Sequence, residues 1–530
     1  MTTTERRLKS FYKKKNPIAI LCGVFAFACL LPMVTQARPP LRRTPGQIDI
    51  NNPPLPRAGV YTEHLDQKLL FDLVSNFQER RATLLAIGRG DSGFENIFAA
   101  DQNFGVGANI GTGARFSRLP RADLNGPGQW ASHIPARATG PNGQSCVECH
   151  TLTMPDGAGF ISHNVIRDPL HSGDPTQYIQ RSAPHVFGLG AVQLLAEEMT
   201  AELQATLTLA KNEACVSNNT LSVTKSLSAK GVSFGSVTVR QTLGNPSPRC
   251  NVLTNDVSGV DSDLVVKPLQ RKGITATIRD FVRGAEHNEL GIQPVEMVGE
   301  GVDGDGDGAT NEFSVGDVTA LTMYLASQPR ATTKLELAAM GFIPLLTSGE
   351  LLSIERGRAT FDRVGCAVCH VPELKLNSAV FSEPSQSPWY RDAAFPAGQN
   401  PVAMFVDPAH PLLLDLARDV DGGLTPFQND SQGRVRVELF SDLKRHDLGA
   451  EDSESIDEAG TGRGTWLTRS LWGMGSTPPY MHDGRATDLD QAIQVHGGEA
   501  AGSRALFNAL SSGEKQDVSA YLLNLRLFKP

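Results

Sequence analysis

The chain has 530 residues, of which 40% are hydrophobic and 20% are charged, and its formal net charge is −8. This length and composition exclude a disordered or fibrous protein and predict a globular protein of two or more domains. The negative charge argues against nucleic acid or an anionic membrane surface as a partner.

The N-terminus has the pattern of an export signal. Within residues 1–37, a basic start precedes an apolar run from Ile18 to Leu31, and small residues lie around Ala37, where a signal peptidase would cut. The run is shorter than the roughly 20 residues of a bilayer-spanning helix, which favours cleavage over an uncleaved anchor. Cleavage takes the formal charge from −8 to −13, because the segment carries six basic residues and one acidic residue. We therefore expect a periplasmic or secreted protein with no stable membrane span.

The next segments predict an extended arm and then a first domain. Residues 38–60 are rich in proline and predict the arm. Residues 61–340 are expected to form an N-terminal domain, with an amphipathic stretch near Leu65–Ile87 and a helix over Ala191–Leu209. Alternating Val, Ser and Thr over 215–265 predicts strands, that is, a small β insertion.

Two cysteines, Cys215 and Cys250, flank or lie within this insertion. Free thiols are unusual in an oxidising compartment, so a disulfide between them is favoured. Two unrelated buried thiols are the alternative.

Two copies of the pattern Cys-x-x-Cys-His indicate covalent haem attachment. Two thiols at this spacing can add to the two vinyl groups of one haem, and the following histidine reaches the iron as proximal ligand. A zinc half-site or a redox dithiol is less favoured, because no partner ligand pair and no βαβ context accompany either copy. We expect two covalently bound haem c groups, held by Cys146, Cys149 and His150, and by Cys366, Cys369 and His370.

An acidic glycine-rich loop predicts a calcium site. Carboxylates at positions 1, 3 and 5 with glycine at position 6 suit Ca²⁺, and three such carboxylates repel one another without a cation. The twelfth position is Ser314, where a glutamate is usual, so Glu312 or Asp317 is the substitute. An acidic solvated turn is the alternative. The candidate ligands are Asp303, Asp305, Asp307, Asn311 and Glu312.

Residues 341–530 are expected to form a second cytochrome c-like haem domain. Thr347–Glu350 and Ser511–Glu514 are capping boxes that predict a first helix leading into the haem motif and a last helix crossing it. The middle, 374–460, is loop-rich. The predicted fold is therefore mainly α, with two cytochrome c-like haem domains, long loops and a small β insertion.

Three stretches together resemble the bacterial di-haem cytochrome c peroxidase superfamily, and more narrowly its di-haem oxidoreductase branch, which is related to rubber oxygenases. They are Arg283–Met297, the second haem motif, and Thr477–Arg485 with its Pro-Tyr-x-His-Asp-Gly pattern. The resemblance implies that the first haem binds peroxide and the second passes electrons to it. It also implies a catalytic acid/base role for Glu296 in the Pro-Val-Glu-Met stretch, since peroxide cleavage needs a group that moves a proton between its two oxygens.

The sequence departs from that family at the second iron. Peroxidases of the superfamily place a methionine after the Pro-Tyr-x-His-Asp-Gly pattern, whereas this chain has His496 there, as rubber oxygenases have a histidine. We assign His370 and His496 to the second iron, with Met474 and Met481 as alternatives. Two histidines would give a lower potential than histidine with methionine.

Two questions stay open: the route of electrons between the haems and the sixth ligand of the first iron. The tryptophan that relatives carry before the glutamate stretch is replaced by Gln270–Gly273, while Trp466 and Trp472 lie in the second domain. The histidines that compete as resting sixth ligand of the first iron are His163, His171, His185 and His287.

The expected function is that of an exported di-haem c-type oxidoreductase that reduces hydrogen peroxide at the first haem with electrons passed through the second. A soluble donor such as a small cytochrome or a cupredoxin would supply the electrons. The alternatives are oxidation of another organic or protein substrate on the same scaffold, and a non-catalytic di-haem electron carrier.

Overall fold

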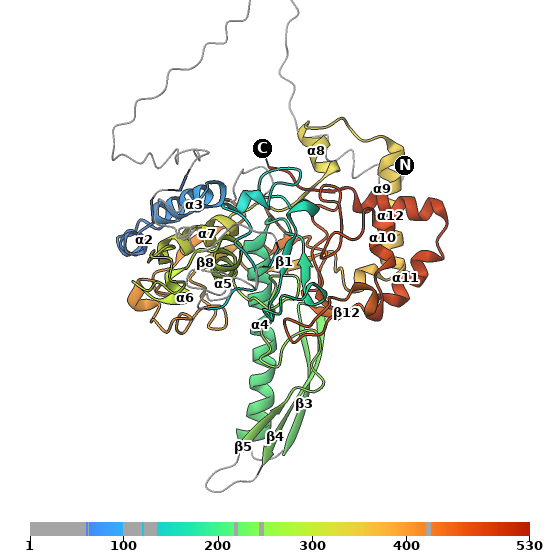
Figure 1. The fold of residues 1–530 in the computed structure, drawn as a ribbon. Coiled ribbons are helices and arrows are strands. Elements are labelled where there is room, and N and C mark those ends of the chain that lie inside the picture. The colour runs from blue at the N-terminus through green and yellow to red at the C-terminus, as the bar shows by residue number, and fades with distance from the viewer. Residues whose placement is uncertain are drawn as a thin grey trace, which may run out of the picture. The chain divides into compact units, whose positions relative to one another are not determined.

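The largest hydrophobic core gathers around the helices α3 (Glu79–Glu95), α4 (Leu189–Lys211) and α7 (Val315–Ala326) (Figure 1). This computed structural model describes residues 60–61, 63–98, 119–120, 135–216, 221–242, 249–419 and 426–529. Every residue of α7 is buried. A Cβ at Gly90 of α3 would collide with the backbone of Ala320, so glycine permits the close approach of α3 and α7.

The predicted signal peptide, 1–37, and all of the predicted arm except Val60 lie outside the described residues. No helix in the described part of the chain is long and apolar enough to cross a membrane.

The amphipathic stretch predicted near Leu65–Ile87 is helical, but it forms two helices. Asp66 caps α2 (Gln67–Ser75) by accepting a hydrogen bond of 2.8 Å from the backbone N–H of Lys68. Phe77, whose φ is +58°, lies in the turn between α2 and α3. The helix predicted over Ala191–Leu209 is confirmed by α4.

The predicted β insertion is a three-stranded antiparallel sheet that runs alongside α4 (Figure 1). The strands follow the order β3 (Ser222–Ala229), β4 (Val232–Thr242) and β5 (Arg249–Leu253). A disulfide joins Cys215, which follows α4, to Cys250 in β5, with a Cα–Cα distance of 6.1 Å. The favoured pairing of these two cysteines is therefore confirmed, and it ties the sheet to the end of α4.

A second, smaller core gathers the helices that surround the second Cys-x-x-Cys-His motif. Both capping boxes form as predicted: Thr347 begins α9 (Ser348–Arg363) and Ser511 begins α12 (Ser512–Leu522). The two helices cross at Gly357, where a Cβ would collide with the carbonyl oxygen of Asp517. The helices α10 (Leu489–Gln494) and α11 (Ala501–Asn508) complete this group, and Figure 1 shows the four together.

The fold mixes α and β structure, so the expectation of a mainly α chain is corrected. Long loops pair into short antiparallel strands, because an extended segment satisfies its backbone hydrogen bonds by pairing with another. These pairs are β1 (Val165–Arg167) with β2 (Ile179–Arg181), β6 (Thr332–Thr333) with β14 (Leu525–Arg526), β8 (Val380–Glu383) with β9 (Leu412–Asp415), β12 (Arg445–Asp447) with β13 (Thr465–Leu467), and β7 (Leu374–Leu376) with β11 (Val435–Val437) and β10 (Gln428–Asn429).

The remaining helices are short: α5 (Ile278–Ala285), α6 (Val295–Val298) and α8 (Lys334–Met340). The larger core also includes buried residues of the loop-rich middle of the second predicted domain, among them Leu376, Phe381 and Leu414. This middle segment therefore packs mainly with the helices that precede residue 340. The helices α9–α12 form most of the smaller core.

Candidate functional site

The two Cys-x-x-Cys-His motifs fold into the same local structure. Each forms a single 3₁₀ turn, over Cys146–Glu148 and over Cys366–Val368. The histidine that follows donates its backbone N–H to the carbonyl oxygen of the first cysteine, at 3.2 Å for His150 and 3.0 Å for His370. The turn thus brings both thiols and the histidine of each motif close together.

A cavity of about 360 Å³ lies against the second motif. Its walls combine apolar side chains of α9, α10 and α12 with two thiols and five imidazoles, which is the composition of a pocket for a large apolar cofactor with a metal. The key lining residues are Cys366, Cys369, His370, His496, Phe361, Leu489, Ile493, Val518 and Leu522.

Two imidazoles of this cavity, those of His370 and His496, are arranged like a pair of metal ligands. The ring centroids of His370 and His496 are 6.4 Å apart. Two imidazoles that ligate one ion from opposite sides, each at a metal–nitrogen distance of about 2 Å, place their centroids roughly 6 Å apart. Nδ1 of His370 lies 3.0 Å from the carbonyl oxygen of Phe440, and Nδ1 of His496 lies 2.7 Å from that of Ala492. These bonds fix Nδ1 as the donor nitrogen and leave each Nε2 for a metal.

Both rings are neutral at physiological pH, as ligation requires. Burial, together with the neighbouring His496, lowers the pKa of His370 to about 4. Burial also lowers the pKa of His496. The donor set of two thiols at vinyl spacing and two neutral imidazoles therefore fits a haem. Met474 and Met481, the alternative ligands, also line the cavity.

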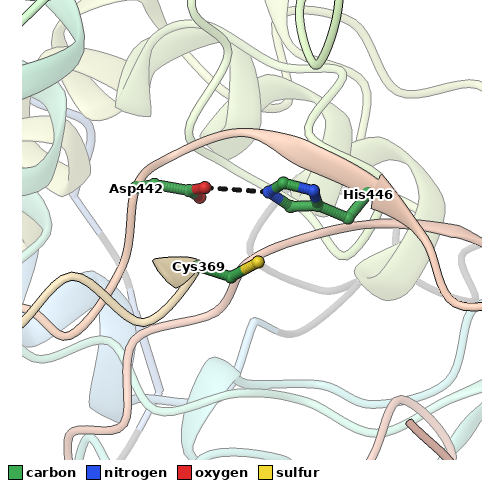
Figure 2. A group of neighbouring side chains, drawn as sticks. All are labelled: Cys369, Asp442 and His446. Atoms are coloured by element: carbon green, nitrogen blue, oxygen red, sulfur yellow. Dashed lines mark hydrogen bonds and ion pairs between the residues drawn. The ribbon is translucent and has the colours of Figure 1, made fainter. Parts of the chain in front are cut away.

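Cys369 lies beside a charged pair, Asp442 and His446 (Figure 2). His446 Nε2 is 2.8 Å from Asp442 Oδ2, and its Nδ1 is 2.8 Å from Glu499 Oε2. Burial lowers the pKa of His446, but hydrogen bonds with Asp442 and Cys369 outweigh burial and raise the pKa to about 11. Because both ring nitrogens are engaged and the ring is cationic, His446 is a fixed positive charge beside the Cys369 sulfur and not a metal ligand.

The first motif has a comparable histidine in a different setting. Nδ1 of His150 lies 3.2 Å from the carbonyl oxygen of Gly157, and its ring packs 5.6 Å from that of Phe94. Burial lowers the pKa of His150. In the described part of the chain, no histidine ring is paired with His150 as His496 is paired with His370.

Glu286 is a buried carboxyl group close to this first motif. It is 1% exposed, and its Oε2 has no hydrogen-bond partner among the described residues. Burial, with a contribution from Asp317, raises the pKa of Glu286 to about 8. Burial and the charge of Glu286 together raise the pKa of Cys146, so the two side chains lie within electrostatic reach.

Glu296, the residue that the family resemblance assigns as acid/base, is fully buried in a charged cluster. Its Oε2 accepts hydrogen bonds from Arg279 Nε at 3.1 Å and Arg283 Nη1 at 3.0 Å, and its Oε1 accepts from Arg279 Nη2. Glu383 and Asp392 complete the cluster, each 2.8 Å or less from one of these arginines. Both carboxylate oxygens of Glu296 are therefore occupied.

Three of the four histidines proposed as sixth ligand of the first iron are engaged by backbone groups. His185 Nδ1 accepts from the N–H of Phe187 at 3.2 Å, and the ring also bonds to the backbone of Trp472. Nε2 of His171 lies 2.6 Å from the carbonyl oxygen of Arg137, and Nε2 of His287 lies 2.8 Å from that of Pro135.

The acidic loop brings part of the predicted calcium set together. Ligand oxygens of Asp303, Asp305 and Asp307 lie within 4.8 Å of one another. Burial and Asp307 raise the pKa of Asp305 to about 7. Asn311 instead turns its side-chain oxygen to the N–H of Gly301, at 2.6 Å.

Glu312 lies behind this loop and is 1% exposed. One of its oxygens accepts a hydrogen bond from the N–H of Gln293, and the other has no partner in the described structure. Burial, with Asp305 and Asp307, raises the pKa of Glu312 to about 10. Burial thus raises the pKa of three carboxyl groups at this loop, those of Asp305, Asp307 and Glu312, and the neighbouring carboxylates add to the effect.

The two predicted domains meet beside the cavity. Lys272, in the place of the missing tryptophan, is fully buried and donates to the carbonyl oxygens of Gly462, Arg463 and Thr465. Its ammonium lies 3.8 Å from the ring centroid of Trp466, which stacks on His482. Trp466 is far from Lys272 in the sequence, but the fold brings the two side chains into contact.

The comparisons with known proteins cover only part of the chain. Residues 421–525 match the family model described as "Di-haem oxidoreductase, putative peroxidase". This match covers the segment that holds His446, Trp466, His482 and His496, and it supports an oxidoreductase that uses haem. No curated protein matches.

Among solved structures, a hydrazine synthase of Kuenenia stuttgartiensis pressurized with xenon is similar, with 18% identity and a TM-score of 0.21. The likeness covers 42% of this chain and 59% of that one, so the chain spans under two thirds of that protein. A TM-score of this size does not establish a shared fold.

Proposed function

We propose that this chain is an exported c-type di-haem oxidoreductase that reduces hydrogen peroxide at the first haem. The facing pair of His370 and His496 in a cavity that also holds two cysteines is the observation that supports this most. In this proposal His370 and His496 would both hold the second iron, which would pass electrons, and His150 would hold the first iron, which would react with peroxide.

The family match to residues 421–525 supports the same class of chemistry. When bound, haem supplies an iron that reacts with peroxide and stores oxidising equivalents. The overall change takes up two electrons and two protons for each peroxide and releases two waters. A small cytochrome or a cupredoxin in the periplasm or outside the cell is the proposed electron donor.

The protein's own contribution at the first site is to move protons. Two glutamates are candidates: Glu296, from the family resemblance, and Glu286. A proton carrier needs a free oxygen and a pKa near the working pH. Glu286 Oε2 meets both conditions, since burial raises the pKa of this residue to about 8 and the oxygen has no partner in the described structure.

Glu296 has the opposite character, because Arg279 and Arg283 occupy both its oxygens. We therefore propose Glu286 as the group that exchanges a proton with peroxide. We propose Glu296 as the positioning residue that joins α5, which leads into Glu286, to α6.

Calcium binding by the acidic loop is part of the proposal. Asp303, Asp305, Asp307 and Glu312 offer the oxygen ligands, and Gln293 joins the loop to the Glu296 segment: its side-chain oxygen accepts from Gly304 at 2.9 Å. A bound ion would thus stabilise the wall that carries the charged cluster.

The test is to purify the exported protein and measure haem content, added mass and peroxide turnover with a reduced small cytochrome c. Two thioether-bound haems and turnover would support the proposal. Two haems without turnover, with both irons six-coordinate, would favour the electron-carrier alternative. A chain without covalent haem would overturn the proposal.

A further inference from the structure

Two arginines of the cavity have no carboxylate partner. Arg271 and Arg469 both line the cavity that contains His370 and His496. Arg271 Nη2 donates to the Ser182 hydroxyl at 2.7 Å and to its carbonyl oxygen at 3.1 Å, and Arg271 Nε is buried without a partner in the described structure. For Arg469 no side-chain hydrogen bond or ion pair with a described residue is found.

The surroundings confirm that these two cations lack a counter-charge. Burial lowers the pKa of Arg469 to about 10, and burial with the charge of Arg469 lowers that of Arg271 to about 9. The nearest carboxylates to Arg271 belong to other partners. Asp452 lies 3.0 Å from His482 Nδ1, and Asp483 lies 2.8 Å from Arg485 Nη2.

The arginines of the Glu296 cluster differ from Arg271 and Arg469 because they have carboxylate partners. There Arg279 and Arg283 are more deeply buried than Arg271 and Arg469, but four carboxylates pair with them, and the pKa of each arginine is raised. An enclosed cation without such a partner is unfavourable. Two such cations that line one cavity, close enough for their charges to interact, therefore indicate that a molecule that binds in this cavity brings negative charge.

We propose that Arg271 and Arg469 bind the propionate carboxylates of the haem attached at Cys366 and Cys369. The inference rests on the proposed function and adds the anion site of its cofactor. Thioether bonds use the vinyl edge of a haem, which leaves its two carboxylates for two guanidinium groups. A guanidinium fork matches a carboxylate in shape and charge.

The proposal has a structural consequence. Arg271 precedes residue 340, whereas Arg469 and the cysteines follow it. Ser182, which holds Arg271, also donates its backbone N–H to the carbonyl oxygen of His482 at 2.7 Å. The carboxylates would thus bind both predicted domains at once, where Lys272 and Trp466 already join them.

The experiment compares Arg469→Gln and Arg271→Gln with Arg418→Gln, whose side chain is 82% exposed outside the cavity. Haem content comes first, because covalent attachment keeps the haem in all three variants. The midpoint potential of the second haem is then titrated over a range of pH. Loss of a cation favours the ferric form, so both cavity variants are expected to have a lower potential.

The same variants shift the pH-dependent step of the potential to higher pH, because a propionate without its arginine holds its proton more tightly. Arg418→Gln leaves both quantities unchanged. Arg469→Lys retains the charge but loses the fork of the guanidinium group. Its midpoint potential is expected to lie between those of the wild type and Arg469→Gln. This variant replaces Arg469→Gln in the comparison if the glutamine variant does not fold.

Potentials and pH steps that match the wild type in both cavity variants would overturn the inference. So would a potential that depends on added phosphate or chloride, because that dependence would indicate a free-anion site. A wild-type chain without covalent haem is a different result, which would overturn the proposed function.

Discussion

The two haem motifs share one turn but differ in what faces their histidines. His370 is paired with His496 across a cavity, and its ring is flanked by Phe361. His150 packs on Phe94, and the carboxyl group of Glu286 lies within electrostatic reach of Cys146 in the same motif. In the proposed function, the shared motif would attach each haem, whereas residues far away in the sequence would decide whether its iron stores electrons or reacts.

The prediction with the largest expected effect tests whether the two haem attachment sites are independent. The double variant Cys366→Ala/Cys369→Ala is expected to retain one haem of two, and Cys146→Ala/Cys149→Ala to retain the other, because each haem needs its own thiols. Haem absorbance per chain and intact mass measure the loss. Retention of both haems in either variant would contradict two independent sites.

The second test separates the roles proposed for the two glutamates, Glu286 and Glu296. Glu286→Gln removes the proton that the reaction needs and is expected to slow peroxide turnover by about 10²-fold or more, with both haems attached. Glu296→Gln breaks a buried ion-pair cluster and is expected to cost about 3–5 kcal/mol of stability. Turnover and thermal unfolding of the two isosteric variants give the comparison. Full activity in Glu286→Gln would remove it from the proton path.

Removal of calcium is expected to have a smaller effect. A chelator should lower the free energy of unfolding by about 3 kcal/mol relative to Ca²⁺ at 100 times its Kd, because the ion binds only the folded loop. The variant Asp305→Asn should lose most of this dependence. Unfolding curves with Ca²⁺ and with chelator measure it, and curves that coincide for the wild type would exclude the site.

The smallest expected effect concerns His446. Its folded-state pKa of about 11 lies above the ordinary value of 6.5, so its contribution to stability is complete below pH 6.5 and is lost as pH rises toward 11. His446→Gln should be less stable than the wild type at pH 6, and the difference should shrink at higher pH. A stability difference that grows with pH would contradict the assigned charge.

The sequence predicted local features well. The capping boxes at Thr347 and Ser511 mark where α9 and α12 begin, because a cap is a contact between residues three apart. The β insertion followed from period-two alternation, and its disulfide from the oxidising compartment.

The rest depended on contacts that no local pattern records. Glu286 and Glu296 lie ten residues apart in one stretch, and only the fold shows that one is locked by arginines and the other is not. Arg271 and Arg469 meet at one cavity from positions almost 200 residues apart. The mainly α expectation failed because paired loop segments give weak period-two signals.

The most direct measurement is an EPR spectrum of the purified protein, as isolated and after one-electron reduction. We predict a low-spin signal from the iron between His370 and His496, together with a high-spin ferric signal from the iron at His150 in at least one of the two states. Two low-spin signals in both states would contradict the account, because they would leave no open iron for peroxide.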